Sequence, residues 1–228
     1  MIGTLYIVST PIGNLEDITH RAVRILTEVS VIAAEDTRHT KNLLTHYQIH
    51  TPLTSYHDFN KEEKSAVLIA RMKEGDSIAL VSDAGTPTIS DPGYFLINQA
   101  ILAEIPVSPI PGPSAAISAL SASGLPTDRF AFEGFMPRKK GPRAKKLMAL
   151  QSDPRTLIFY ESPYRVLGLL ADIETAFGNR RVVICREMTK KFEEVIRGEV
   201  KEVIQKLENK KLLGEFTFVV EGNREKKD

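Results

Sequence analysis

Short apolar runs alternate along the chain with longer segments whose apolar residues recur at helical spacing. In the first half, the short runs have the length of buried strands and cover residues 4–8, 31–34, 78–81 and 107–110. The segments between them predict helices at residues 17–29, around Leu43 and Tyr47, from Asn60 to Gly75, from Pro92 onward, and up to Ser123. Strands that alternate with helices predict parallel βαβ units in an α/β domain.

Capping side chains set the expected starts of these helices. Asp17 precedes the first helix, Asn60 and Glu63 have the spacing of a capping box, and Asp91 stands directly before Pro92. Proline is favoured at the first helical position, so we expect Asp91 to cap the helix that begins at Pro92. The pattern of residues 53–59 is ambiguous.

A turn-rich break at Gly124–Asp128 separates the second half of the chain. Beyond it, strands are expected at residues 130–135, 156–160, 181–185 and 216–220, with helices that carry the apolar stripes Val166–Phe177 and Val200–Leu207. The sequence therefore predicts two α/β domains, residues 1–124 and residues 125–228.

Composition narrows the class of protein. Hydrophobic residues make up 42% and charged residues 26% of the 228 residues, as in soluble globular proteins. Because the net charge is only +1, contact with nucleic acid would have to come from a local basic patch. A single cysteine, Cys185, excludes an internal disulfide and favours a reducing compartment. With no signal peptide or membrane-spanning run apparent, the sequence favours a cytoplasmic location.

Polar loops that contain glycine or proline follow the predicted strands, and Ser82–Pro87 is the clearest of them. Loops at the carboxyl edge of a sheet converge, so we expect those after Val8, Ala34, Val81, Ile110, Tyr160 and Cys185 to line one cleft. The alternative is that each loop is polar because it is exposed. That explains less well why the same loops concentrate Asp, Glu, Arg and Thr.

Several common sequence motifs for nucleotide binding, nucleophilic catalysis and metal binding are absent from the sequence. There is no GxGxxG or GxxxxGK[ST] motif for a nucleotide, no Gly-x-Ser-x-Gly elbow, and no His/Cys cluster at zinc spacing. The five histidines are scattered along the chain, so we expect no metal.

Six motifs follow one another along residues 4 to about 222: Val8–Asn14, Ala33–Thr40, Ser82–Pro87, Ile110–Ala115, Phe159–Pro163 and Arg186–Lys190. In this order they resemble the tetrapyrrole-methylase superfamily, and within it the branch that methylates the ribose of cytidine in 16S ribosomal RNA. Many members of that branch continue for several dozen helical residues beyond the last strand, which this chain does not.

The resemblance implies two α/β domains with S-adenosylmethionine between them, usually in a homodimer. The residues that match the family's cofactor site are Pro11, Asp83, Thr86, Ser114, Ala115, Tyr160, Phe216 and Thr217. The alternative for Pro11 is plain turn chemistry.

Charged loop residues are the candidates for catalysis, because a ribose hydroxyl must lose its proton to accept a methyl group. Glu35, Asp36, Glu161 and Glu187 are candidate bases, and the cations Arg38, Arg165, Arg186 and Lys190 could hold phosphate or lower the pKa of the hydroxyl. From this set the catalytic assignment is Glu35, Arg38, Glu187 and Lys190. The alternative for each of them is a structural salt bridge.

The basic run Pro137–Lys146 is the candidate RNA contact, through Arg138, Lys139, Lys140 and Arg143. Its glycine and prolines suggest a mobile loop, and the alternative is a solvated segment that enters a helix. For the whole protein, two other functions remain open: C-methylation of a corrin or porphyrin precursor, and a catalytically silent module that binds RNA or nucleotide.

Overall fold

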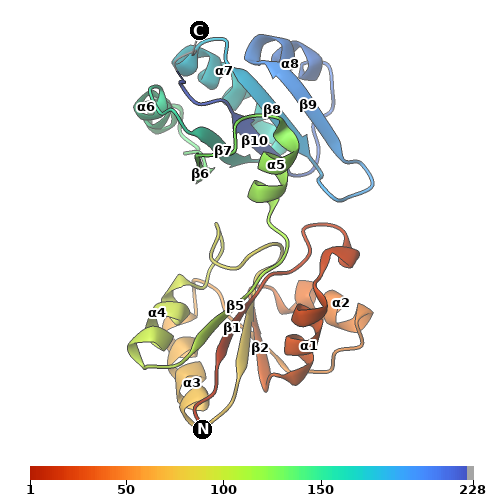
Figure 1. Cartoon of the computed structure of the whole chain (residues 1–228), viewed down its shortest axis with the longest axis vertical. Helices are drawn as coiled ribbons and strands as arrows, with labels where there is room; N and C mark the ends of the chain where they lie inside the picture. Colours follow the sequence, from red (N-terminus) through yellow and green to blue (C-terminus); the bar gives the residue numbers. More distant parts are fainter. Residues whose placement is uncertain (225–228) are drawn as a thin grey trace. The chain divides into compact units, whose positions relative to one another are not determined.

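The structure, a computed structural model, describes residues 1–224. It divides the chain into two compact units, Met1–Ser114 and Ala115–Asp228 (Figure 1). The boundary falls before helix α5 (Ala115–Ser123), whereas the sequence predicts it after that helix. The physical reason is that Ala116, Ala119 and Leu120 of α5 are buried against Ile158 and Val219 of the second unit. The break at 124–128 is therefore a connection within that unit.

The first unit is built on a five-stranded sheet with strand order β3-β2-β4-β1-β5, in which every pair is parallel. The predicted parallel arrangement is confirmed, and the ambiguous region contains β3. The strands are β1 (Leu5–Val8), β2 (Val31–Ala34), β3 (Leu53–Ser55), β4 (Ile78–Val81) and β5 (Val107–Ile110).

Helices cover both faces of this sheet, which explains its continuous apolar strands. One face packs against α1 (His20–Glu28) and α2 (Thr37–His46), and the other against α3 (Lys61–Lys73) and α4 (Tyr94–Leu102) (Figure 1). Alternate residues of each strand point to opposite faces, so Ile32 lies in one core and Ala33 in the other.

The second unit is a mixed sheet with strand order β6-β7-β10-β8-β9, in which only β6 and β7 pair in parallel. Its strands are β6 (Phe130–Phe135), β7 (Thr156–Glu161), β8 (Arg181–Arg186), β9 (Glu194–Glu199) and β10 (Phe216–Val220). Helix α5 packs on one face, and the other face bears α6 (Lys140–Leu150), α7 (Val166–Phe177) and α8 (Val200–Leu207). Strand β9 is absent from the prediction because Ile196 is its one buried residue.

Several helix starts differ from the predicted ones. Asp17 lies in a short 3₁₀ turn, Leu15–Asp17, and Thr19 instead caps α1 by accepting the Ala22 N–H at 3.1 Å. Helix α3 begins after Asn60 as expected, but the Asn60 side chain accepts the N–H of His57 and does not cap. Helix α4 begins at Tyr94 after Gly93 (φ 137°), which frees Asp91 from capping.

The basic run is also more ordered than predicted. Lys140–Leu150 forms helix α6, and Pro142 is tolerated because it lies in the first turn, where its missing N–H removes no helical hydrogen bond. In the part of the chain that the structure covers, no helix is both long and apolar enough to cross a membrane.

Candidate functional site

The carboxyl edge of the first sheet brings together the loops that follow β1, β4 and β5. Thr10 and Gly85 form an isolated bridge: the Thr10 N–H donates to the Gly85 carbonyl at 2.9 Å, and the Gly85 N–H donates back at 3.0 Å. Gly85 has φ 82°, a conformation that favours glycine. The backbone of the Ser82–Pro87 loop is therefore fixed against the loop after β1.

Thr86 joins three of the loops through its hydroxyl. Its Oγ1 lies 3.0 Å from the Ser9 Oγ and donates to the Pro113 carbonyl at 3.2 Å. Ser114 follows directly on Pro113. Thr86 thus holds the edge together, and Ser114 is placed beside it.

A small cavity of about 130 Å³ opens at this edge and contains two of the predicted cofactor residues, Pro11 and Asp83. Asp83 Oδ1 accepts the backbone N–H of Asp36 at 3.0 Å, which ties the loop after β4 to the start of α2. Thr40 also lines the cavity; it is 3% exposed, and its Oγ1 has no hydrogen-bond partner among residues 1–224. A buried hydroxyl without a partner is costly, so Thr40 is an unsatisfied polar group next to the cavity.

The Glu35–Thr40 segment is mostly the first turn of α2 and not an open loop. Asp36 caps the helix, and its carboxylate also accepts two hydrogen bonds from the exposed guanidinium of Arg38. Arg38 Nε donates to Oδ1 at 3.1 Å, and Nη2 donates to Oδ2 at 2.8 Å. Hydrogen bonds from the Arg38 side chain and backbone hold the pKa of Asp36 well below its usual range. A carboxylate so stabilised is a poor proton acceptor.

The pKa of Glu35 is shifted in the opposite direction from that of Asp36. Partial burial raises its pKa, and the charges of Asp91 and Asp83 raise it further. The pKa of Asp91 is raised by burial and by the charge of Asp83, against a hydrogen bond from Ser82 that lowers it. The edge therefore carries three facing carboxylates, of which Asp91 is missing from the predicted site because Asp-Pro is typical of a helix start.

In the second unit, strand register places Tyr160, Thr217 and Cys185 in one row across β7, β10 and β8. Tyr160 Oη accepts the N–H of Ala116, the residue after Ala115, at 3.1 Å. The Tyr160 ring forms T-shaped pairs with the rings of Phe132 and Phe135. Tyr160, Thr217 and the start of α5 are thus neighbours, as the resemblance implies.

Phe216 lies on the other face of the same sheet. Neighbouring residues of a strand point to opposite faces, and the Phe216 ring is 2% exposed in the core beneath α6, α7 and α8. Its side chain is therefore not available as a wall beside Tyr160, and a contact between this position and the cofactor would have to come from its backbone.

Glu187 and Lys190 form a tightly bonded loop after β8. Glu187 Oε1 accepts the Lys190 Nζ at 3.1 Å and the Glu215 N–H at 3.0 Å, and both Glu187 and Thr189 have positive φ. Burial raises the pKa of Glu187, but these hydrogen bonds outweigh it and the net pKa is lowered. Gly214 permits the contact, since a Cβ there would fall 2.4 Å from the Glu187 carboxyl. The pair therefore has a structural role, which leaves Glu187 a weak base.

The remaining charged candidates are also paired. Glu161 is 2% exposed and binds Arg165, with Oε1 to Nε at 2.7 Å. Arg186 donates to the Leu213 carbonyl at 2.8 Å and lies 3.6 Å from Glu194. Cys185 is buried, which raises the pKa of its thiol to about 11 and makes it unreactive.

Arg143 departs from its predicted role in RNA contact. Its side chain is 11% exposed, and its Nε donates to Asp172 Oδ2 of α7 at 2.5 Å. It joins α6 to α7 and is not displayed to solvent. Arg138, Lys139 and Lys140 are exposed, and so is Lys145 on the same helix.

Solved structures share this fold. A cobalt precorrin-4 methyltransferase matches with TM-score 0.69 at 18% identity, covering 96% of this chain and 94% of that one. A uroporphyrin-III C-methyltransferase from Thermus thermophilus, complexed with S-adenosyl homocysteine, matches with TM-score 0.65 at 17% identity, covering 95% and 97%. The fold is therefore that of the tetrapyrrole-methylase class.

The profile of the Tetrapyrrole (Corrin/Porphyrin) Methylases matches residues 4–204, and the chain belongs to this family of methyltransferases. Among its relatives, ribosomal RNA small subunit methyltransferase I of Halalkalibacterium halodurans is 54% identical over 224 residues, which are 98% of this chain and 78% of that protein. The protein of the same name from Escherichia coli O157:H7 is 51% identical over 225 residues, which are 97% and 79%.

Proposed function

We propose that the protein transfers a methyl group from S-adenosylmethionine to the ribose 2′-hydroxyl of a cytidine in small-subunit (16S) ribosomal RNA. The observation that carries the proposal is the sequence identity of this chain, over nearly its whole length, to proteins named ribosomal RNA small subunit methyltransferase I. The charged side chains after β2 and β8 support it, because burying such groups against an apolar macrocycle would be unfavourable.

The residues at the edge of the first sheet fit the proposed cofactor. Asp83 keeps a carboxylate oxygen free to meet a cationic group, and Pro11 adds an apolar surface to the same cavity. When bound, the cofactor supplies an activated methyl group, so the protein contributes mainly alignment. Thr86, by holding three loops together, keeps these groups in place.

Glu35 is the proton acceptor we propose for the ribose hydroxyl. A general base works best when its pKa lies near the working pH, and among Glu35, Asp36 and Glu187 only Glu35 has a raised pKa. For the exposed Arg38 guanidinium, which is held by Asp36, we propose contact with a phosphate of the same nucleotide.

The test offers labelled S-adenosylmethionine with unmethylated small ribosomal subunits, free 16S rRNA or a tetrapyrrole precursor. We expect label in the RNA, on a cytidine ribose by mass spectrometry of the digest. Assembled subunits are expected to be the better substrate, since the target nucleotide must be splayed out and held. A methyl group on a base, or label only in the tetrapyrrole, would refute the proposal and favour the corrin or porphyrin reaction.

Helix α6 provides a contrast between exposed and buried cations. Replacing Lys139, Lys140 and Lys145 by alanine is expected to weaken RNA binding and to lower the slope of log K against log salt by about 0.7–0.9 for each phosphate that is no longer neutralised. Replacing Arg143 by alanine is expected instead to lower the free energy of unfolding by about 3–5 kcal/mol, because Asp172 is left buried and unpaired. Filter binding and urea unfolding of both variants check this, and a salt slope unchanged in the lysine variant would contradict it.

We further propose that the protein is a cytoplasmic homodimer. Support for the dimer comes from α4, where Tyr94, Ile101 and Leu102 are 76%, 60% and 71% exposed. Exposed apolar side chains that cluster in this way are typical of an interface. Sedimentation equilibrium is expected to give twice the chain mass for the native protein and the single mass after Ile101→Lys with Leu102→Lys; a native monomer would refute the proposal.

A further inference from the structure

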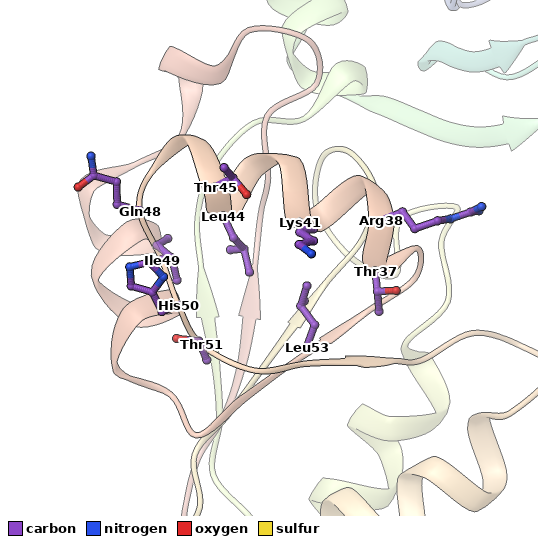
Figure 2. Close-up of a pocket in the computed structure, with 10 residues that line it drawn as sticks. All are labelled: Thr37, Arg38, Lys41, Leu44, Thr45, Gln48, Ile49, His50, Thr51 and Leu53. Atoms are coloured by element: carbon purple, nitrogen blue, oxygen red, sulfur yellow. The ribbon is translucent and has the colours of Figure 1, made fainter.

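A second and larger cavity, of about 750 Å³, is lined by the face of helix α2 opposite to the face that lines the site's cavity. Figure 2 shows the residues around it. Lys41, Leu44 and Thr45 of α2 form one wall, and His50, Thr51 and Leu53 form the other. Its second wall leads into β3, the edge strand of the first sheet. We call this cavity the α2 groove.

The α2 groove and the site's cavity share one helix. Thr40 lines the site's cavity, and Thr37 and Lys41 line the groove, so successive residues of α2 serve the two hollows. The two cavities lie on opposite faces of this helix, whose diameter with side chains is about 10–12 Å. Figure 2 shows Lys41 projecting from α2 toward the wall that carries Leu53, while Arg38 extends away at the end of the helix.

The charge of the groove selects an anion. In the part of the chain that the structure describes, no Asp or Glu side chain lines it, whereas Arg38, Lys41 and His50 do. Arg38 is already bound to Asp36, but within residues 1–224 neither Lys41 nor His50 forms an ion pair. The threonine hydroxyls at positions 37 and 45 add neutral hydrogen-bonding groups beside Lys41.

The size of the groove also fits a nucleotide. Sites for small organic ligands measure about 300–1,000 Å³ and combine an apolar floor with a few polar groups. Leu44, Ile49 and Leu53 provide the apolar part of the lining, against which a ribose or base can lie while Lys41 meets the phosphate.

We propose that the α2 groove binds the RNA backbone next to the target nucleotide, with Lys41 on a phosphate. This inference rests on the proposed function, since it names a contact that an RNA substrate of the same site would make. It assigns RNA contact to the first unit, whereas the basic run of the sequence is in the second.

Charge reversal tests the proposal. We expect Lys41→Glu to weaken binding of unmethylated 16S rRNA at least about 10-fold at 0.15 M salt and to lower the salt slope by about 0.7–0.9. Thr45→Glu, which adds a carboxylate to the same wall, is expected to weaken RNA binding similarly. Lys41→Arg keeps the positive charge and is expected to bind RNA as the native protein does. Lys73→Glu is the matched control, because Lys73 is an exposed lysine in the last turn of α3, which leads to the amino edge of the sheet. Calorimetry should give one affinity for S-adenosylmethionine in all four variants.

Each outcome decides the question. If the native protein methylates RNA, and Lys41→Glu and Thr45→Glu bind RNA as Lys73→Glu does, the groove proposal is overturned and the proposed function stands. If the native protein labels no RNA, the proposed function fails and the groove proposal fails with it. The proposal is supported if RNA binding is weakened in Lys41→Glu and Thr45→Glu, is retained in Lys41→Arg, and cofactor affinity is retained in all of them.

Discussion

Replacing Asp83 by asparagine is expected to weaken the binding of S-adenosylmethionine by about 10- to 150-fold. Asparagine keeps a carbonyl oxygen for the Asp36 N–H, so the loop after β4 should remain tied to α2. Removing the charge removes a hydrogen bond to an ionised group, worth about 1.5–3 kcal/mol. Isothermal titration calorimetry in excess chelator measures the effect and tests the expectation that no metal takes part.

Asp76→Asn is the matched control. Asp76 is also an aspartate of the first unit and is ion-paired to Arg71 at 2.7 Å, but it lies before β4, at the amino edge of the sheet. We expect this variant to bind the cofactor as the native protein does. Native affinity in Asp83→Asn would remove Asp83 from the cofactor site.

Replacing Glu35 by glutamine is expected to lower kcat by about 10²–10⁴-fold, the contribution typical of a general base. Glutamine has nearly the same shape and keeps an oxygen for the backbone N–H of Asp83, but it cannot take a proton. Because the bonds of Gly85 to Thr10 and of Asp83 to Asp36 fix the cofactor loop, cofactor affinity is expected to change little. Single-turnover methylation of small subunits measures the rate of the chemical step.

The pH profile separates this role from a structural one. A base acts in its deprotonated form, and burial together with Asp91 and Asp83 raises the pKa of Glu35. The rate should therefore fall as the pH drops through that raised pKa, at a higher pH than an ordinary glutamate would give. Asp91→Asn removes one of these charges, so the fall of the rate at low pH is expected to occur at a lower pH in this variant. If the rate of Glu35→Gln falls at the same low pH as that of the native protein, another group takes the proton.

Much of the architecture follows from the chain's local pattern. Runs such as Ile78–Val81 are apolar throughout because their strand is buried on both faces, and this is visible in sequence. The parallel arrangement and the gathering of loops at one edge follow from the alternation of strands and helices. The sequence predicts Pro11 and Asp83 in one site, and the structure places both on one cavity.

Other features depend on partners far away in the chain, and only the tertiary structure decided them. Helix α5 has small apolar residues that suit either unit, and its assignment rests on packing against Ile158 and Val219. Arg143 is indistinguishable from its basic neighbours in sequence, but Asp172, 29 residues away, buries it. Asp91 has the sequence of a helix cap, but the backbone turns at Gly93 and leaves its carboxyl beside Asp83. Periodicity determines which faces of an element are apolar, whereas the pairing of charges depends on which elements meet in space.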